Sequence, residues 1–169
     1  MTQSRIAVYP TSANPPTLGH ADIVCRASRQ FDHVFWAAAV NPNKQYLFTQ
    51  EERVQMMTEY VRHHGLENVT VETYSGATVR YAQKCGATAL VKGLRNPDDF
   101  QGEYQQALGN LGIEPAIETF CLFGRPEYYG VSSSLARELA LLGENIEGFV
   151  LPAVAEMVVK ILRERQSGT

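Results

Sequence analysis

Four short segments place phosphate-binding side chains directly after apolar runs of strand length. They are Thr17-Leu-Gly-His20, Asn41-Pro-Asn-Lys44, Lys92-Gly-Leu-Arg95 and Tyr128-Tyr-Gly-Val-Ser-Ser-Ser134. Imidazole, ammonium, guanidinium and hydroxyl groups all donate hydrogen bonds to phosphate oxygens. Each segment alone is a weak signal, because a helix cap, a solvated lysine or a polar turn has the same composition. Together, four such segments after four strand-like runs predict a phosphate-binding site.

His20 closes a stiff polar segment, Pro10 to His20, which contains two adjacent prolines and leads into a run with helical spacing. The first turn of a helix has unpaired N–H groups and the positive end of the helix dipole. A phosphate is favoured there, and an imidazole beside it can donate to a phosphoryl oxygen. The alternative is that His20 merely caps the helix.

Three further groups follow later strand-like runs. Lys44 can neutralise a phosphate or be simply solvated, while Lys92 and Arg95 are two nearby cations that form a compact anion clamp. The three serines 132–134 open an amphipathic run with Arg137 one turn in. Helix N-capping explains one serine, and three with an arginine indicate a second phosphate cradle.

Several common kinds of site are missing from the sequence. No G-x-G-x-x-G follows the first strand-like run and no G-x-x-x-x-G-K-[ST] occurs, so common dinucleotide binding and P-loop chemistry are not indicated. His33, His63 and His64 have no acidic or thiol partner at metal-ligand spacing, so no protein metal site is expected. No serine or cysteine has a recognisable base and elbow, so a covalent mechanism is not indicated.

Strand-like and helical runs alternate along the whole chain. The predicted strands are Ile6–Tyr9, Val34–Val40, Val69–Tyr74, Ala89–Gly93 and Ile117–Phe123. The predicted helices are Gly19–Gln30, Thr49–His64, Thr78–Cys85, Asp98–Leu108, Ser133–Leu142 and Ala153–Arg165. Thr49-Gln-Glu-Glu52 has the pattern of a capping box. This order predicts an α/β fold, a doubly wound five-stranded parallel sheet, with ligands beyond the carboxyl ends of its strands.

Length and composition restrict the class of protein. The 169 residues fit a single domain, 1–169, and the net charge of −3 argues against nucleic-acid or anionic-membrane partners. Cys25, Cys85 and Cys121 lie far apart in apolar runs, so we expect three reduced, buried thiols. The first strand begins within a few residues of Met1, which leaves no room for a signal peptide, and no apolar run is long enough to span a membrane. A cytoplasmic location is therefore expected.

The four segments and their spacing resemble the nucleotidyltransferase superfamily, and within it the bacterial phosphopantetheine adenylyltransferases. The pattern is T-x-G-H, a lysine after the second strand, [KR]-G-L-R and [VI]-S-S-S-x-x-R, and the resemblance extends over nearly the whole chain. Asp22-Ile-Val, Phe31-Asp-His-Val34, Phe48-Thr-x-Glu-Glu-Arg53, Asp99-Phe100 and Asn110 also match. It implies a Rossmann-like nucleotidyltransferase fold and transfer of the adenylyl group of ATP to 4′-phosphopantetheine, giving dephospho-coenzyme A and pyrophosphate. It further implies a homohexamer and Mg²⁺ bound through the ATP phosphates.

The resemblance also implies roles for individual residues. His20 would donate to the α-phosphate, and Lys44 would orient the phosphates. Ser12 would contact both substrates, and Lys92 and Thr78 would bind the acceptor. The residues that would contact ATP are Ser12, Ala13, His20, Gly93, Leu94, Arg95, Glu103, Tyr128, Tyr129, Gly130, Val131, Ser132, Ser133 and Ser134. No nucleophilic side chain is required, since the acceptor phosphate is the nucleophile, and positioning and charge stabilisation supply the rate.

Three positions depart from the family pattern, and two other functions stay open. The family usually has Gly-Thr-Phe-Asp-Pro at Thr11–Pro15, arginine at Lys92, and Asp-Phe-Glu-Tyr-Glu where this chain has Asp-Phe-Gln-Gly-Glu, ending at Glu103. The Thr11–Thr17 segment also resembles nicotinate mononucleotide adenylyltransferases. Lys44 and the spacing from K-G-L-R to Glu103 favour the pantetheine acceptor. A nucleotide-binding protein without catalysis is ranked last, because His20 and Lys44 are both present.

Overall fold

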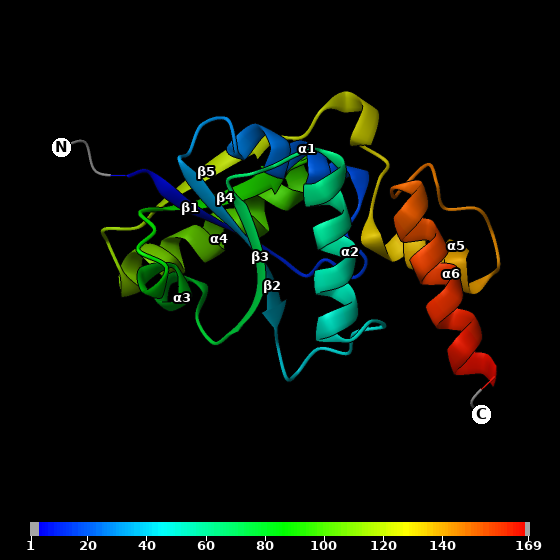
Figure 1. Cartoon of the computed structure of the whole chain (residues 1–169). Helices are drawn as coiled ribbons and strands as arrows, with labels where there is room; N and C mark the ends of the chain where they lie inside the picture. The colour runs from blue at the N-terminus through cyan, green and yellow to red at the C-terminus, as the bar shows by residue number, and fades with distance from the viewer. Residues whose placement is uncertain (1–3, 168–169) are drawn as a thin grey trace.

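The computed structural model describes residues 4–167 and contains one five-stranded parallel sheet (Figure 1). Its strands are β1 (Ile6–Thr11), β2 (His33–Val40), β3 (Val69–Ser75), β4 (Ala89–Leu94) and β5 (Glu118–Phe123). The helices are α1 (Leu18–Ala27), α2 (Gln50–His63), α3 (Thr78–Lys84), α4 (Pro97–Ile113), α5 (Ser133–Leu141) and α6 (Pro152–Ser167), with a short 3₁₀ turn η1 (Pro126–Tyr128). The predicted fold class is confirmed.

The strand order is β3-β2-β1-β4-β5, and every neighbouring pair is parallel. The direction of winding therefore reverses between β1 and β4. In open α/β sheets a crevice forms at this switch point, beyond the carboxyl ends of the two central strands. The topology alone thus indicates where a ligand would bind.

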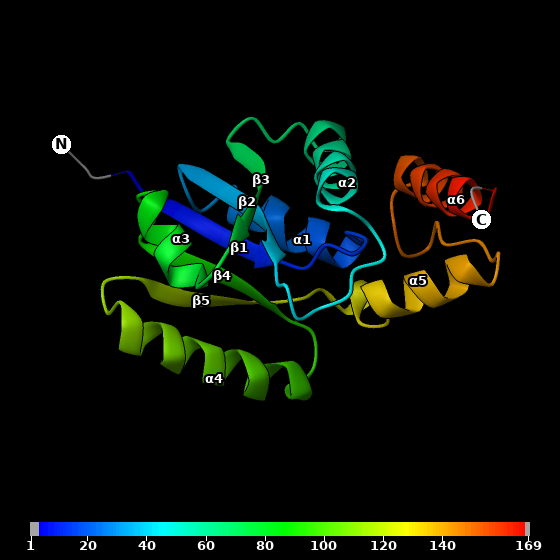
Figure 2. The ribbon, with the colours of Figure 1, turned by 90° about the horizontal axis from the view of Figure 1, so that it is seen from below.

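Helices cover both faces of the sheet. Figure 2 shows α1 and α2 on one side of the strands and α3 and α4 on the other. The core on the first side includes Trp36, Met56 and Tyr60, and also receives buried residues of α5 and α6. The smaller core on the second side includes Val8, Val79 and Leu90. These two layers explain why the central strands read as continuous apolar runs.

The element boundaries differ from the sequence prediction in two informative places. Strand β1 does not end at Tyr9 but continues through Pro10 to Thr11, in register with Ala38 of β2. Helix α4 extends past Leu108 to Ile113. The glycines past Leu108 weaken the helix without ending it, because the neighbouring residues keep their backbone hydrogen bonds. The capping box at Thr49 is confirmed, with the Glu52 carboxylate accepting the Thr49 N–H at 2.7 Å.

The expectation of three buried thiols is wrong. Cys25 and Cys85 are half-buried, and Cys121 is exposed. Cys121 lies on β5, an edge strand on which none of the residues is fully buried. The outer position of that strand, which only the strand order reveals, explains the exposure.

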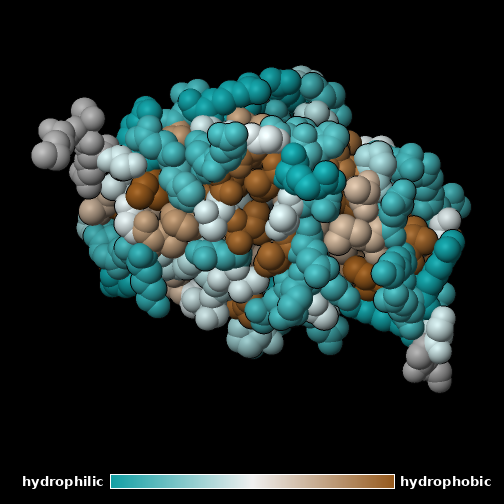
Figure 3. Space-filling view, viewed as in Figure 1, coloured by the Kyte–Doolittle hydropathy of each residue, from teal (hydrophilic) through white to brown (hydrophobic). Residues whose placement is uncertain are grey.

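The surface is mixed in character. Figure 3 shows hydrophilic side chains over much of one face, with apolar side chains gathered near its centre. No helix among residues 4–167 combines the length and apolar character needed to cross a bilayer.

Candidate active site

An open cleft of about 490 Å³ lies at the carboxyl ends of β1 and β4. This is the switch point of the sheet, as the strand order predicts. The sequence-predicted site residues that line it are Ser12, His20, Lys44, Thr78, Lys92, Gly93, Arg95, Glu103, Tyr128, Val131, Ser132, Ser133 and Ser134. The four phosphate-binding segments therefore meet in one place.

Four of the predicted site residues do not line this cleft. Ala13 is fully buried, with a left-handed φ of 44°, a conformation that costs a non-glycine residue about 1–2 kcal/mol. Leu94 is also buried, with its side chain in the protein interior. Tyr129 is 64 % exposed, and neither it nor Gly130 is among the lining residues. Side-chain contact between these four residues and a ligand in the cleft is therefore not supported.

His20 lies in the first turn of α1, and the chain around it fixes one of its two ring nitrogens. Nδ1 accepts the backbone N–H of Thr17 at 3.1 Å and lies 2.9 Å from the Thr17 hydroxyl oxygen. A neutral imidazole has one N–H and one acceptor nitrogen. Because Nδ1 is the acceptor, Nε2 carries the proton of the neutral ring. The ring can therefore donate one hydrogen bond from Nε2.

The protein environment keeps the His20 ring neutral. Burial disfavours the charged imidazolium and, together with the positive charge of Arg95, lowers the pKa of His20 to about 4. At neutral pH the ring is thus an uncharged donor. In this state the ring can donate one hydrogen bond from Nε2 to a phosphate oxygen.

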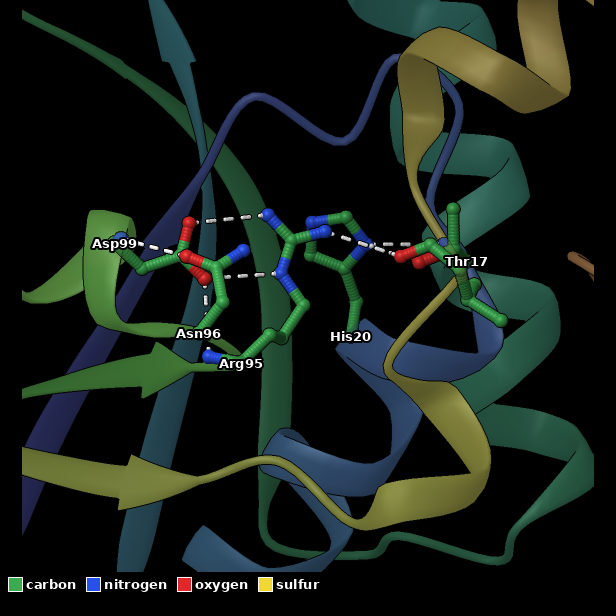
Figure 4. Close-up of polar contacts among 6 residues, drawn as sticks. Thr17, His20, Arg95, Asn96 and Asp99 are labelled. Carbon is green, nitrogen blue, oxygen red and sulfur yellow. Dashed lines mark hydrogen bonds and ion pairs between the residues drawn. The ribbon is translucent and has the colours of Figure 1, made fainter.

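Arg95 follows β4 and is held from two sides (Figure 4). Its Nε lies 3.2 Å from Oδ2 of Asp99, in the first turn of α4, and its Nη1 donates to the carbonyl of Val131 at 3.0 Å. Asp99 in turn accepts the backbone N–H of Arg95 at 2.9 Å. The guanidinium therefore connects the β4–α4 loop to the segment that precedes α5.

Lys44 and Ser12 come from the loops that follow β2 and β1, and Nζ of Lys44 donates to Oγ of Ser12 at 3.1 Å. Behind them lies Arg53 of α2, which is 1 % exposed. Arg53 donates from Nη1 to the carbonyls of Ser12 and Ala39, at 2.8 and 3.0 Å. A buried arginine thus joins the loop that follows β1 to the end of β2 beside the cleft.

Lys92 of β4 is almost fully buried, and its ammonium contacts α4. Nζ lies 2.7 Å from Oε2 of Glu103 and donates to Oε1 of Gln106 at 3.0 Å. Lys92 and Glu103, which the family resemblance assigns to different substrates, are therefore an ion pair in this structure.

The three serines before and within α5 have different partners. Ser132 is the N-cap, and its hydroxyl accepts the N–H of Leu135 at 3.2 Å. Ser133 donates to the carbonyl of Pro15 at 2.8 Å. Arg137 donates to the carbonyl of Asn14 and lies 3.3 Å from the Ser134 hydroxyl. Ser133 and Arg137 therefore attach α5 to the β1–α1 loop, in addition to lining the cleft.

Gly93 allows β4 to approach α1 closely. A Cβ at this position would lie 2.9 Å from Cγ1 of Ile23, which is closer than van der Waals contact permits. Glycine at this position therefore maintains the close packing of the strand against the helix that carries His20.

Sequence reasoning missed several cleft residues. Gln106 lies one turn after Glu103, a helical spacing that could have pointed to it. Tyr74, the second-last residue of β3, has its hydroxyl 2.8 Å from that of Thr78, and no charged side chain in the sequence pointed to it. Asn14 accepts the Phe48 N–H at 3.1 Å, a contact across 34 positions that no local pattern indicates.

The donor set of the cleft does not form a metal centre of the protein's own. Among residues 4–167 no three His, Cys, Asp or Glu side chains are grouped so as to bind a metal ion. The cleft carboxylates of Asp99 and Glu103 each face a cation, Arg95 and Lys92 respectively. Such a cleft suits an anionic ligand that brings its own cation.

Known proteins resemble this chain in sequence over most of its length. Residues 8–139 match the cytidylyltransferase-like family. The phosphopantetheine adenylyltransferase of Heliobacterium modesticaldum is 44 % identical over 149 residues, which cover 88 % of each chain. The enzyme of the same name from a Synechococcus species is 47 % identical over 95 % of this chain and 97 % of its own.

Solved structures support the fold. A putative nicotinate-nucleotide adenylyltransferase from Vibrio parahaemolyticus superimposes with a TM-score of 0.75 at 21 % identity, covering 96 % of this chain and 97 % of its own. The nicotinic acid mononucleotide adenylyltransferase of Plasmodium falciparum, complexed with APC, has a TM-score of 0.69 at 13 % identity over 94 % and 96 % of the chains. At these identities the likeness concerns the fold alone.

Proposed function

Because this chain belongs to the cytidylyltransferase-like family, and within it to the phosphopantetheine adenylyltransferases, we propose that its cleft transfers the adenylyl group of ATP to 4′-phosphopantetheine. The products are dephospho-coenzyme A and pyrophosphate. The observation that carries the assignment is the meeting of His20, Lys44, Lys92 and Arg95 in one cleft at the switch point. We propose one adenylyltransferase domain over residues 1–169.

The reaction needs positioned charge and no nucleophilic side chain. An oxygen of the acceptor phosphate attacks the α-phosphorus of ATP, and the bond to pyrophosphate breaks. Nε2–H of His20 donates to the α-phosphate as negative charge builds on it, while Lys44 orients the phosphates beside Ser12. Donors that bind the transition state better than the ground state raise the rate.

The remaining cleft residues divide between the two substrates. Lys92 and Thr78 bind the acceptor, on the side where Tyr74 lines the cleft. Gly93, Arg95 and Glu103 contact ATP, with Glu103 near the ribose. The segment 128–134 closes over the adenine and the β- and γ-phosphates. For Ala13, Leu94, Tyr129 and Gly130, which do not line the cleft, contact with ATP stays a prediction.

Mg²⁺ accompanies ATP in this proposal. The cleft carboxylates Asp99 and Glu103 each face a cation, so the phosphates of ATP supply the main ligands of the metal. When bound there, the ion would supply positive charge beside the leaving pyrophosphate. Lys44 and Arg95 are the residues of this chain placed to share that task.

We also propose that the enzyme is a cytoplasmic homohexamer. ATP and the coenzyme A precursors are cytoplasmic metabolites, and the three cysteines form no disulfide. Helix α4 has no buried residue, and its exposed side chains Phe100, Tyr104, Leu108 and Leu111 lie three or four residues apart, on one face. Phe123 of β5 is also exposed. An apolar face of this kind is typical of a subunit interface.

An acceptor screen tests the proposed function. The purified protein is incubated with ATP, Mg²⁺ and either 4′-phosphopantetheine or nicotinate mononucleotide, and pyrophosphate release is followed. We expect turnover with 4′-phosphopantetheine and little or none with nicotinate mononucleotide. Turnover with the nucleotide alone would reject the pantetheine assignment, and binding of ATP without any turnover would favour a protein that has lost catalysis.

A further inference from the structure

The ammonium of Lys92 has a directional partner and an electrostatic one. It donates a hydrogen bond to Oε1 of Gln106 at 3.0 Å. Its contact with Oε2 of Glu103, at 2.7 Å, is an ion pair, and this oxygen has no aligned hydrogen bond within residues 4–167. Glu103 therefore supplies charge, while Gln106 determines the direction in which one of the ammonium hydrogens points. An ammonium has three hydrogens, so at least one stays free for a ligand.

The chemistry of Lys92 also determines how the Gln106 amide is turned. An ammonium can only donate, so the amide must present its oxygen to Lys92 and its NH₂ group to the other side. Gln106 lines the cleft and is exposed to solvent there. Within residues 4–167 no side chain or backbone carbonyl accepts from this NH₂ group. Two neighbouring nitrogen donors, one charged and one neutral, thus line the same part of the cleft.

Resting on the function proposed above, we propose that Gln106 is a specificity-determining residue that forms, together with Lys92, a two-donor fork for the phosphate of the acceptor. Arginine binds phosphate through two parallel N–H groups of one rigid plane, whereas lysine alone makes a single point contact. The hydrogen bond between Lys92 and Gln106 joins two flexible side chains into a pair with two donor nitrogens.

The arrangement explains how a lysine can replace a guanidinium at this position. Lys92 supplies the charge and Gln106 adds a second direction, so that two oxygens of one phosphate are held at once. Glu103 alone would repel a phosphate dianion, but the positive charge of the ammonium, 2.7 Å from the carboxylate, offsets that repulsion. The fork therefore recognises the phosphate monoester of the acceptor and not its organic part.

The test compares Gln106→Leu, which keeps the size of the side chain but removes the amide, with the wild-type enzyme. We expect the KM for 4′-phosphopantetheine to rise about tenfold, the typical effect of losing a hydrogen bond to a charged group, with the KM for ATP nearly unchanged. Inhibition by pantetheine, which lacks the phosphate, should be the same in both proteins. Gln105→Leu is the matched control, because Gln105 is exposed on α4 and does not line the cleft.

A second background separates phosphate binding from a merely structural role. In Lys92→Arg the guanidinium supplies both donors, so adding Gln106→Leu should change the KM for 4′-phosphopantetheine less than twofold. The proposal would be overturned if Gln106→Leu left the KM for 4′-phosphopantetheine unchanged, or if it weakened inhibition by pantetheine as much as it raised that KM. In either case the wild-type activity would still support the proposed function. Wild-type enzyme that ignores 4′-phosphopantetheine would instead reject the proposed function itself.

Discussion

The guanidinium of Arg95 lies beside the imidazole of His20 in the cleft (Figure 4). Together with burial, its positive charge keeps that ring neutral. Arg95 follows β4 and His20 lies in α1, so the two residues are 75 positions apart in the chain. Burial is the larger cause of the lowered pKa of His20, and the positive charge of Arg95, which would also help to bind a phosphate, adds to it. His20 is left as a neutral donor through Nε2.

The first prediction concerns the catalytic contribution of His20. His20→Ala should lower kcat by a factor of about 10² to 10³, the usual effect of removing a donor that acts on transition-state charge, with little change in ATP affinity. Steady-state kinetics and an independent ATP-binding measurement check this. His33→Ala is the control, because His33 begins β2 and bonds to Thr70, away from the cleft. Normal turnover in His20→Ala would reduce His20 to a helix cap.

The second prediction concerns the pH dependence of stability. The pKa of His20 is about 4 in the folded protein and near its ordinary 6.5 in the unfolded chain. Between these values the unfolded chain binds more protons at this ring, so lowering the pH from 6.5 to 4 favours unfolding. In His20→Asn, whose amide oxygen can still accept the Thr17 N–H, the free energy of unfolding should fall less between pH 7 and pH 5. Equal slopes for the two proteins in urea titrations would contradict this.

The third prediction concerns Lys92 and the choice of acceptor. Lys92→Ala should raise the KM for 4′-phosphopantetheine tenfold or more, in line with the loss of a charge-assisted hydrogen bond, and affect the KM for ATP less. Lys92→Arg should be tolerated, because a guanidinium keeps the charge and supplies a planar fork. Lys84→Ala, at an exposed position of α3, serves as the control. A greater effect on ATP than on the acceptor would show that Lys92 belongs to the nucleotide side.

The fourth prediction concerns the contact between Gly93 and Ile23. Gly93→Ala should destabilise the protein by about 1–3 kcal/mol, because its Cβ would lie 2.9 Å from Cγ1 of Ile23. In an Ile23→Ala background the same substitution should cost much less, since the space is then open. Gly102→Ala is the control: nothing lies within 4 Å of its Cβ, and alanine favours the helix by up to about 1 kcal/mol. Urea unfolding gives all three values, and an equal cost in both backgrounds would exclude this clash.

The fifth prediction concerns the exposed apolar face of α4. Wild-type protein should have six times the 18.8 kDa mass of one chain in light scattering after size exclusion. Leu108→Glu should produce smaller species, because a charge cannot be buried in an apolar contact. Leu142→Glu, at the end of α5 and 71 % exposed, should leave the mass unchanged. A monomeric wild type, or a Leu108→Glu variant of unchanged mass, would rule out this face as the interface.

Local pattern was enough to predict the fold class and many of the residues that line the cleft. Alternating apolar strands and helical runs require a parallel sheet covered on both faces, and in such a sheet the residues after each strand share one edge. His20, Lys44, Arg95 and Ser133 could therefore be grouped from the sequence, although nothing in it states their distances. The left-handed backbone of Ala13 and the burial of Leu94 could not be read in this way, because both depend on neighbours distant in the chain.

The amino-acid sequence by itself determined which side chains follow the strands, and hence the kind of ligand that the cleft can take. Only the tertiary structure decided how these side chains pair. Strand order places β4 beside β1 and lays α4 over β4, and this arrangement sets Lys92 against Glu103 and Gln106. The fold likewise brings the Arg95 guanidinium to the carbonyl of Val131. The physical reason is range: propensity and periodicity act over a few residues, whereas an ion pair requires two groups within about 4 Å in space.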